Sequence, residues 1–132
     1  MASWDDVAAI ATALPEVAEE PIHGMRAWKV RKKLFVWERR LRKKEIEQLG
    51  EAAPDGEILG VRVPDEEAKL ALLASEPEVY FTTPHFDGHL SVLLLLGRIP
   101  RVDLEEAIVE AWLCRAPKRL ADAYLAEYRS RR

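Results

Sequence analysis

Eight prolines divide this 132-residue chain into short segments, and they constrain its fold more than any other feature. The prolines are Pro15, Pro21, Pro54, Pro64, Pro77, Pro84, Pro100 and Pro117. Proline is excluded from helix interiors and central strands, so each helix or strand should lie between two of them. The chain has no linker, repeat or low-complexity tract, and its length is typical of one domain. We therefore predict a single domain over residues 1–132.

The spacing of apolar residues between the prolines predicts four helices. The first covers residues 4–14, where Ser3 can cap the helix and apolar side chains recur at helical spacing. The second covers residues 65–75 and begins with acidic residues, which favour the positive end of a helix dipole. Two further helices are expected from residue 103 onward, because Pro117 is suited to end one and begin the next.

Alternating or continuous apolar residues predict strands in the other segments. Strands are expected within residues 17–40 and at 58–63, 79–82 and 90–96. Residues 31–33 separate two apolar stretches, which predicts a hairpin. This order of elements predicts an α+β fold. The single domain would have a mainly antiparallel sheet of about five to six strands, an N-terminal helix, a mid-chain helix and two C-terminal helices.

Three sequence blocks resemble the MmcQ/YjbR family in their order and spacing, and the resemblance covers nearly the whole chain. The blocks are AWKVRKKLFVWERR (27–40), FTTPHFDGHLSVLLLLGRI (81–99) and AWLCRAPKRLADAYLAEY (111–128). The family pattern usually has a glycine in the turn that Lys32 or Lys33 occupies here. The resemblance implies the α+β fold and a DNA-binding role, which rests on the likeness of the family's sheet and hairpins to a double-wing motif. It implies no reaction, cofactor or catalytic residue.

Residues 26–44 are strongly basic, although the whole chain has a net charge of −3. The segment contains one acid, Glu38, and ten cations: Arg26, Lys29, Arg31, Lys32, Lys33, Arg39, Arg40, Arg42, Lys43 and Lys44. Lysine and arginine release the counterions condensed on nucleic acid, and a two-stranded ribbon can enter the major groove. The segment therefore predicts a nucleic-acid interface in which these ten residues bind DNA, mostly at its phosphates. Arg31, Lys32 and Lys33 would lie at the turn, with contributions from Lys29, Arg39 and Arg40.

A second interpretation of the same segment needs no nucleic acid. Cations on an outer strand block unwanted strand pairing. Trp28, Phe35 and Trp37 are then core residues rather than platforms on which bases stack. On this reading the chain is a module for protein interaction or ligand binding, and the basic strand meets an acidic protein surface. The sequence leaves the oligomeric state open. Lys118 and Arg119, in the first turn of the last predicted helix, suggest a second anion site, but we favour simple solvation for them.

No motif of a hydrolase, a nucleotide-binding loop or a metalloprotease occurs, so we expect a non-enzyme without a cofactor. His85, Asp87 and His89 could ligate zinc or iron, but Pro84 and Gly88 indicate a turn, and we predict no metal site. The single Cys114 excludes an internal disulfide and is expected to be a half-buried apolar residue. The longest aliphatic run has five residues and the start lacks a signal-peptide pattern, which predicts a cytoplasmic protein without a membrane partner.

Overall fold

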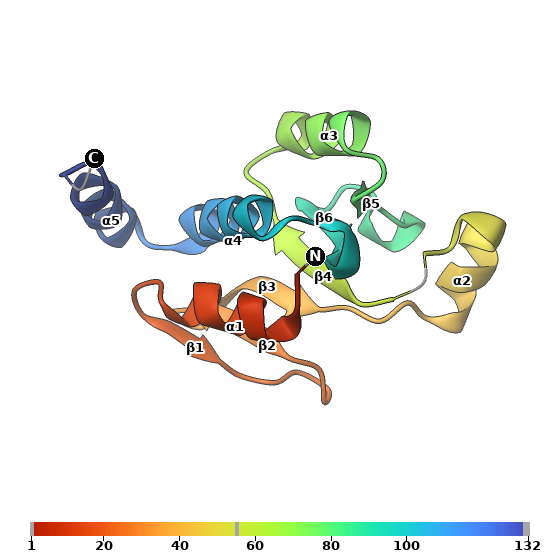
Figure 1. Ribbon diagram of the computed structural model, residues 1–132, viewed down its shortest axis with the longest axis horizontal. Helices are drawn as coiled ribbons and strands as arrows, with labels where there is room; N and C mark the ends of the chain where they lie inside the picture. The colour runs from red at the N-terminus through yellow and green to blue at the C-terminus, as the bar shows by residue number, and fades with distance from the viewer. Residues whose placement is uncertain (1, 55, 131–132) are drawn as a thin grey trace.

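The computed structural model describes residues 2–54 and 56–130. The helices are α1 (Trp4–Thr12), α2 (Lys43–Leu49), α3 (Glu66–Ser75), α4 (Arg101–Arg115) and α5 (Lys118–Ser130) (Figure 1). The strands are β1 (Val17–Glu19), β2 (Ala27–Val30), β3 (Lys33–Glu38), β4 (Ile58–Arg62), β5 (Tyr80–Phe81) and β6 (Ser91–Leu95). Short 3-10 turns lie at Gly50–Ala52, Pro84–Phe86 and Leu96–Arg98.

The strands form one antiparallel sheet with six members in the order β1-β2-β3-β4-β6-β5. The first four strands are neighbours in sequence and in space, whereas β6 lies between β4 and β5. The predicted α+β class and its mainly antiparallel sheet are therefore confirmed, with an N-terminal helix, a mid-chain helix and two C-terminal helices.

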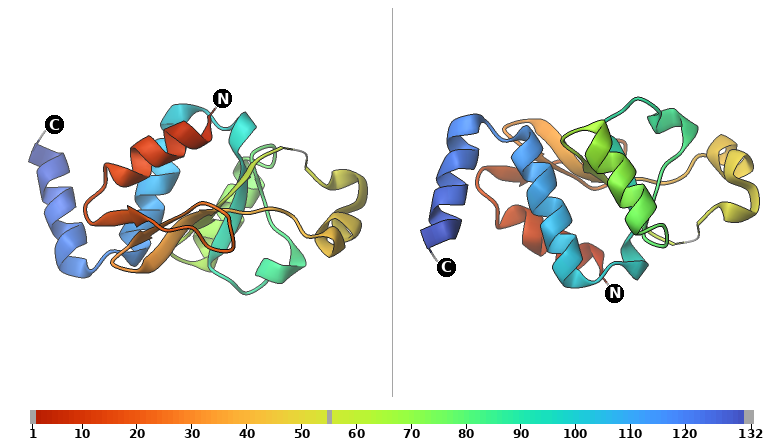
Figure 2. Two further views of the ribbon diagram at one scale, coloured as in Figure 1. Left: turned by 90° about the horizontal axis from the view of Figure 1, so that it is seen from below. Right: turned by 90° about the horizontal axis from the view of Figure 1, so that it is seen from above.

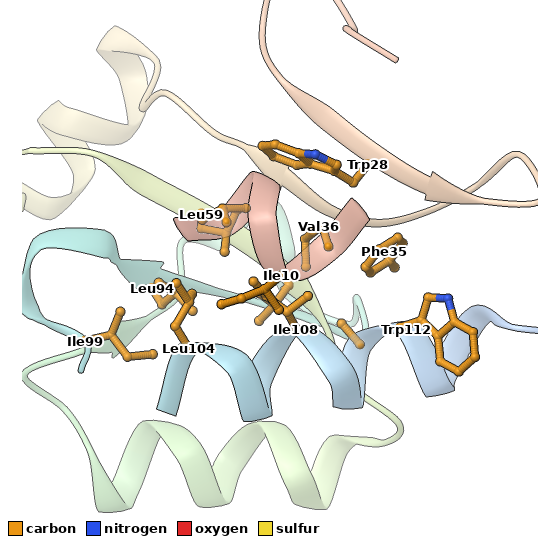
Figure 3. Close-up of a cluster of buried hydrophobic side chains, with 14 of the residues drawn as sticks. Ile10, Trp28, Phe35, Val36, Leu59, Leu94, Ile99, Leu104, Ile108 and Trp112 are labelled. Carbon is orange, nitrogen blue, oxygen red and sulfur yellow. The ribbon is translucent and has the colours of Figure 1, made fainter. Parts of the chain in front are cut away.

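The main core lies on one face of the sheet, under α1 and α4. Val7 and Ile10 of α1 and Leu104 and Ile108 of α4 are buried against Trp28, Val36, Leu59 and Leu94 of the strands. Figure 3 shows Ile10, Leu104 and Ile108 of the helices in the same interior as Val36, Leu59 and Leu94 of the strands. The two views of Figure 2 show α1 and α4 side by side, with α3 on the far side of α4. Burial of so much apolar surface is the main source of stability for this fold.

A smaller cluster covers part of the opposite face. Ile58, Leu93 and Phe86 are buried there, and Trp37 packs against them. The run of apolar residues in β6 is buried on both faces, since Leu93 belongs to this cluster and Leu94 to the main core, as its sequence predicts.

The helix starts follow the capping pattern of the sequence. Ser3 and Asp6 form a reciprocal capping box at α1, which confirms that prediction. Asp65 accepts a hydrogen bond of 2.8 Å from the Ala68 N–H at the start of α3. The helix expected from residue 103 begins two residues earlier, where Leu104 N–H donates to the Pro100 carbonyl. No helix in residues 2–54 and 56–130 has the length and apolarity needed to cross a bilayer.

The helix α2 was not predicted, because its residues reverse the usual burial pattern. Its apolar residue Ile46 is 48% exposed, whereas Glu45 is buried. A short charged segment of this kind has no apolar stripe, so periodicity cannot identify it.

Gly60 of β4 allows the Trp37 indole to lie flat against the sheet. A Cβ atom at position 60 would stand 2.7 Å from the indole nitrogen of Trp37, closer than real Cβ contacts come. Trp37 and Gly60 are direct partners across β3 and β4. The absence of a side chain at position 60 therefore makes room for the aromatic ring.

We predict that Gly60→Ala lowers the free energy of unfolding by about 1–3 kcal/mol, because the indole must leave its position. Urea unfolding at pH 7 measures this difference. Gly97→Ala is the matched control, since no atom lies within 4 Å of the Cβ position at Gly97. The free energy of unfolding of this variant should change little. Equal effects at the two glycines would contradict the proposed contact.

Candidate nucleic-acid interface

The connection between β2 and β3 is a tight turn that presents three consecutive cations. Val30 pairs with Lys33, and Arg31 and Lys32 between them have φ angles of 46° and 70°. Two successive positive φ values are typical of a type I′ hairpin turn, in which glycine or asparagine is favoured. Lysine and arginine are strained in this region. The chain thus maintains exposed charge at a place where local conformation favours other residues.

The strands on either side of this turn are not free to project as a separate ribbon. β2 is flanked by β1 and β3, and β3 is flanked by β2 and β4. The edge of the sheet at this side is β1, not the basic strand β2. Only the turn and the outer faces of the two strands therefore remain open to a partner.

Carboxylates near β1 neutralise three of the predicted cations. Arg31 pairs with Glu16 at 2.7 Å, Arg26 with Glu19 at 2.7 Å, and Lys29 with Glu20 at 3.5 Å. The guanidinium of Arg31 lowers the pKa of Glu16, and that of Arg26 lowers the pKa of Glu19. The Arg31 pair is exposed on both sides, so water and salt weaken it and its guanidinium can exchange Glu16 for another anion.

Arg39 is held inside the protein rather than at its surface. Its guanidinium donates to Glu45 at 2.7 Å and lies over the Phe86 ring at 5.2 Å. Glu45 also accepts hydrogen bonds from the Thr83 hydroxyl at 3.0 Å and the Arg42 N–H at 2.8 Å. Arg39 is 8% exposed and Glu45 is 4% exposed. Arg39 therefore anchors α2 and residues 83–86 to the sheet, and we remove it from the set expected to bind phosphate.

The remaining cations separate into two groups at the two ends of β3. Lys32 and Lys33 lie at the turn, while Arg40, Arg42, Lys43 and Lys44 are exposed before and within α2. Strands rise about 3.3 Å per residue, so β3 alone keeps the two groups on the order of 16 Å apart. The ten predicted residues consequently do not form one continuous surface.

The structure adds a cation from the C-terminal helix to the hairpin turn. Arg31 and Arg119 line the same shallow cleft of about 420 Å³, together with Pro117, Leu120 and Ala123. Lys118 is adjacent and pairs with Asp122 at 2.9 Å. Figure 1 shows α5 at one end of the molecule and α2 at the other. We name Arg31, Lys32, Lys33 and Arg119 the basic tip.

The sequence does not indicate that Arg119 lies beside the β2–β3 turn. The sequence places Arg119 in the first turn of a helix, where simple solvation is the favoured interpretation of a cation. The packing of α5 brings Arg119 to the turn, and this packing includes Leu120 against the core and Tyr124 against Trp112.

His85, His89 and Cys114, the other candidate site residues, contact neighbouring groups of the protein or are half-buried. The rings of His85 and His89 stack with centroids 5.8 Å apart, and Lys69 donates to the carbonyls of Phe86 at 2.7 Å and His89 at 2.9 Å. Among the described residues, no group of three or more His, Cys, Asp or Glu side chains is arranged to hold a metal ion. Burial, with a contribution from the Glu110 charge, raises the pKa of the half-buried Cys114 thiol.

Comparison with known proteins identifies a family and two sequence relatives of this chain. A family model described as YjbR matches residues 12–114, which include the sheet, α2, α3 and all but the last residue of α4 but not Arg119. Two mycobacterial proteins, from Mycobacterium tuberculosis strain H37Rv and Mycobacterium bovis, are 55% identical over 129 residues. The alignment covers 96% of this chain and 98% of each relative, and both are described as uncharacterized proteins.

A solved structure has a similar fold. The crystal structure of Deinococcus radiodurans protein DR2400, with the family-model domain DUF419, superimposes with a TM-score of 0.63. The match has 20% sequence identity and covers 86% of this chain and 78% of the other. At this identity the likeness supports the fold alone.

Replacing Lys32 by glycine should stabilise the turn, because glycine adopts a positive φ without a steric penalty. We expect the free energy of unfolding to rise by about 1 kcal/mol. Lys32→Ala removes the same charge but keeps the strain, so it should not stabilise the protein. Urea titrations of the three proteins test this, and an equal gain in both variants would assign the effect to charge rather than to conformation.

Removing the charge of Glu45 should destabilise the protein, because it leaves the buried Arg39 without its partner. Breaking a buried ion pair costs about 3–5 kcal/mol, so Glu45→Gln should lower the free energy of unfolding by that order at pH 7. Glu47→Gln on the exposed side of α2 is the control and should have an effect within about 0.5 kcal/mol.

The same pair should make stability depend on pH. Burial raises the pKa of Glu45, but hydrogen bonds from Arg42, Thr83 and Arg39 outweigh this, and its pKa is lower than the ordinary value of 4.5. The ionised group therefore stabilises the fold above its unfolded pKa, and this contribution is lost as pH falls through the lower folded value. The stability difference between the wild type and Glu45→Gln should shrink below about pH 4. A difference that does not vary with pH would contradict this.

Proposed function

The chain belongs to the YjbR family, and we propose that it binds double-stranded DNA, without catalysis, through the basic tip of its β2–β3 hairpin and α5. The observation that carries this proposal is the meeting of the hairpin turn with Arg119 at one cleft. The β2–β3 turn and the start of α5 are far apart in the sequence, but their positive charges lie side by side at this cleft.

Two cations of the tip are available to phosphates. Lys32 and Lys33 are exposed and make no ion pair within the described part of the chain. Arg31 and Arg119 line the cleft beside them. A DNA backbone has closely spaced negative charges, so a compact group of cations releases counterions efficiently when it binds.

The aromatic residues of the hairpin favour a duplex over a single strand. Recognition of unpaired bases uses exposed aromatic rings as stacking platforms. Trp28 and Phe35 are fully buried, and Trp37 packs against the small cluster on the opposite face of the sheet. The tip itself thus has charge but no exposed ring, which supports phosphate contact with little sequence preference.

A charge-reversal experiment tests the proposal. Lys32→Glu/Lys33→Glu and Lys43→Glu/Lys44→Glu change the net charge equally, but at opposite ends of β3. Fluorescence anisotropy of a labelled duplex at about 50 and 200 mM salt measures affinity and its salt dependence. The tip variant should bind about tenfold more weakly or worse, and the slope of log affinity against log salt should fall by about two, because two phosphate contacts are lost.

The α2 variant is the matched control and should keep most of the wild-type affinity. Arg119→Glu should weaken binding in the same direction as the tip variant, because it lies in the same cleft. Equal losses in the tip and α2 variants would assign binding to overall charge and contradict the tip. Salt-sensitive self-association without DNA, seen by light scattering, would instead favour a protein partner.

A further inference from the structure

A second surface of opposite charge lies between α3 and α4. A groove of about 380 Å³ runs between these two helices, which lie side by side in Figure 2. Its floor is apolar and includes Val61, Val63, Leu72 and Ala107. This volume is within the range of sites for small organic molecules, and such sites combine an apolar floor with a few polar groups.

The polar groups of this groove are mostly carboxylates. Glu76, Asp103, Glu106 and Glu110 line it, and Arg62 is the cation among its lining residues. The structure gives no ion pair for any of the four acids within residues 2–54 and 56–130. A concentration of unpaired negative charge repels phosphates and attracts cations.

Tyr80 gives this groove a hydroxyl that has no hydrogen-bond partner among the described residues and is not fully buried. The residue is 5% exposed, belongs to the main core and lines the groove. Its hydroxyl makes no hydrogen bond with any group in the described part of the chain. Because Tyr80 lines the groove, a ligand that lies there can supply the hydrogen-bond partner that the protein does not.

The surroundings of Tyr80 also show where the acidic charge converges. Burial raises the pKa of Tyr80 to about 12, and the charges of Glu76, Asp103 and Glu106 raise it in the same direction. The phenol therefore stays protonated at neutral pH. Its oxygen can accept a hydrogen bond from a cationic donor.

We propose that the groove between α3 and α4 binds a small amphipathic organic amine. Its ammonium group contacts the Tyr80 hydroxyl and faces the carboxylates of Glu76, Asp103 and Glu106. Its apolar body rests on the floor formed by Val63, Leu72 and Ala107. A bare metal ion fits less well, because the described residues do not arrange three acidic side chains as a metal site.

The experiment compares 2-phenylethylamine, which is charged at pH 7, with 2-phenylethanol, its neutral analogue of similar shape. Titrations followed by amide chemical-shift changes in NMR spectra locate the site and give both affinities. We expect shifts at residues of α3, β5 and α4, and about tenfold tighter binding of the amine, as one charge-assisted hydrogen bond provides.

Matched variants test the residues. Glu76→Gln/Glu106→Gln should lower amine affinity about tenfold and leave the alcohol unaffected. Tyr80→Phe should weaken the amine by a smaller factor. The control Glu47→Gln/Glu51→Gln removes the same charge from α2 and the turn that follows, and should change nothing. Circular dichroism and urea unfolding confirm that each variant is folded.

Three results would overturn the proposal: equal affinity for amine and alcohol, shifts that lie outside the groove, or amine affinity retained in the double variant of Glu76 and Glu106. Loss of DNA binding in the tip variants has no bearing on this result, because the groove shares no lining residue with the basic tip.

Discussion

The burial of β3 in the middle of the sheet fixes where the charges of this protein can lie. Phe35 and Val36 have no exposed surface, and Val36 pairs with Trp28 on one side and Val61 on the other. A strand so enclosed can carry cations only at its ends. One end is therefore the turn with Lys32 and Lys33, and the other leads through the buried Arg39 to α2. The burial of β3 therefore both stabilises the core and determines where the two basic groups lie.

Elements with local signals could be predicted from the sequence, and those that depend on distant residues could not. Ser3 and Asp65 cap the helices that follow them, and apolar alternation identified the strands. The helix α2 has no such signal, because the residue that it buries is Glu45. The candidate site shows the same division between local features, which could be predicted, and contacts between distant residues, which could not. The turn with Lys32 was predicted, but the pairing of Arg26 with Glu19 and the meeting of Arg31 with Arg119 arise from folding.

The net charge of −3 conceals a molecule with two opposite surfaces. The basic tip lies where the hairpin meets α5, and the acidic groove lies between α3 and α4. The helix α4 connects them, since it contributes Glu106 and Glu110 to the groove and leads directly into α5, which supplies Arg119. The average charge of such a chain is a poor guide to its partners, because a ligand responds to the field nearest to it.

The position of α4 has a consequence for synthesis on the ribosome. The strands β1 to β4 are neighbours in sequence and can pair early, since local contacts need little loop closure. Their apolar face, however, is covered by α1 together with α4, and the Trp112 indole of α4 donates to the Pro15 carbonyl at 3.1 Å. The N-terminal strands therefore lack the cover of α4 until residues 101–115 have been synthesised. The main core cannot be completed before that segment is available.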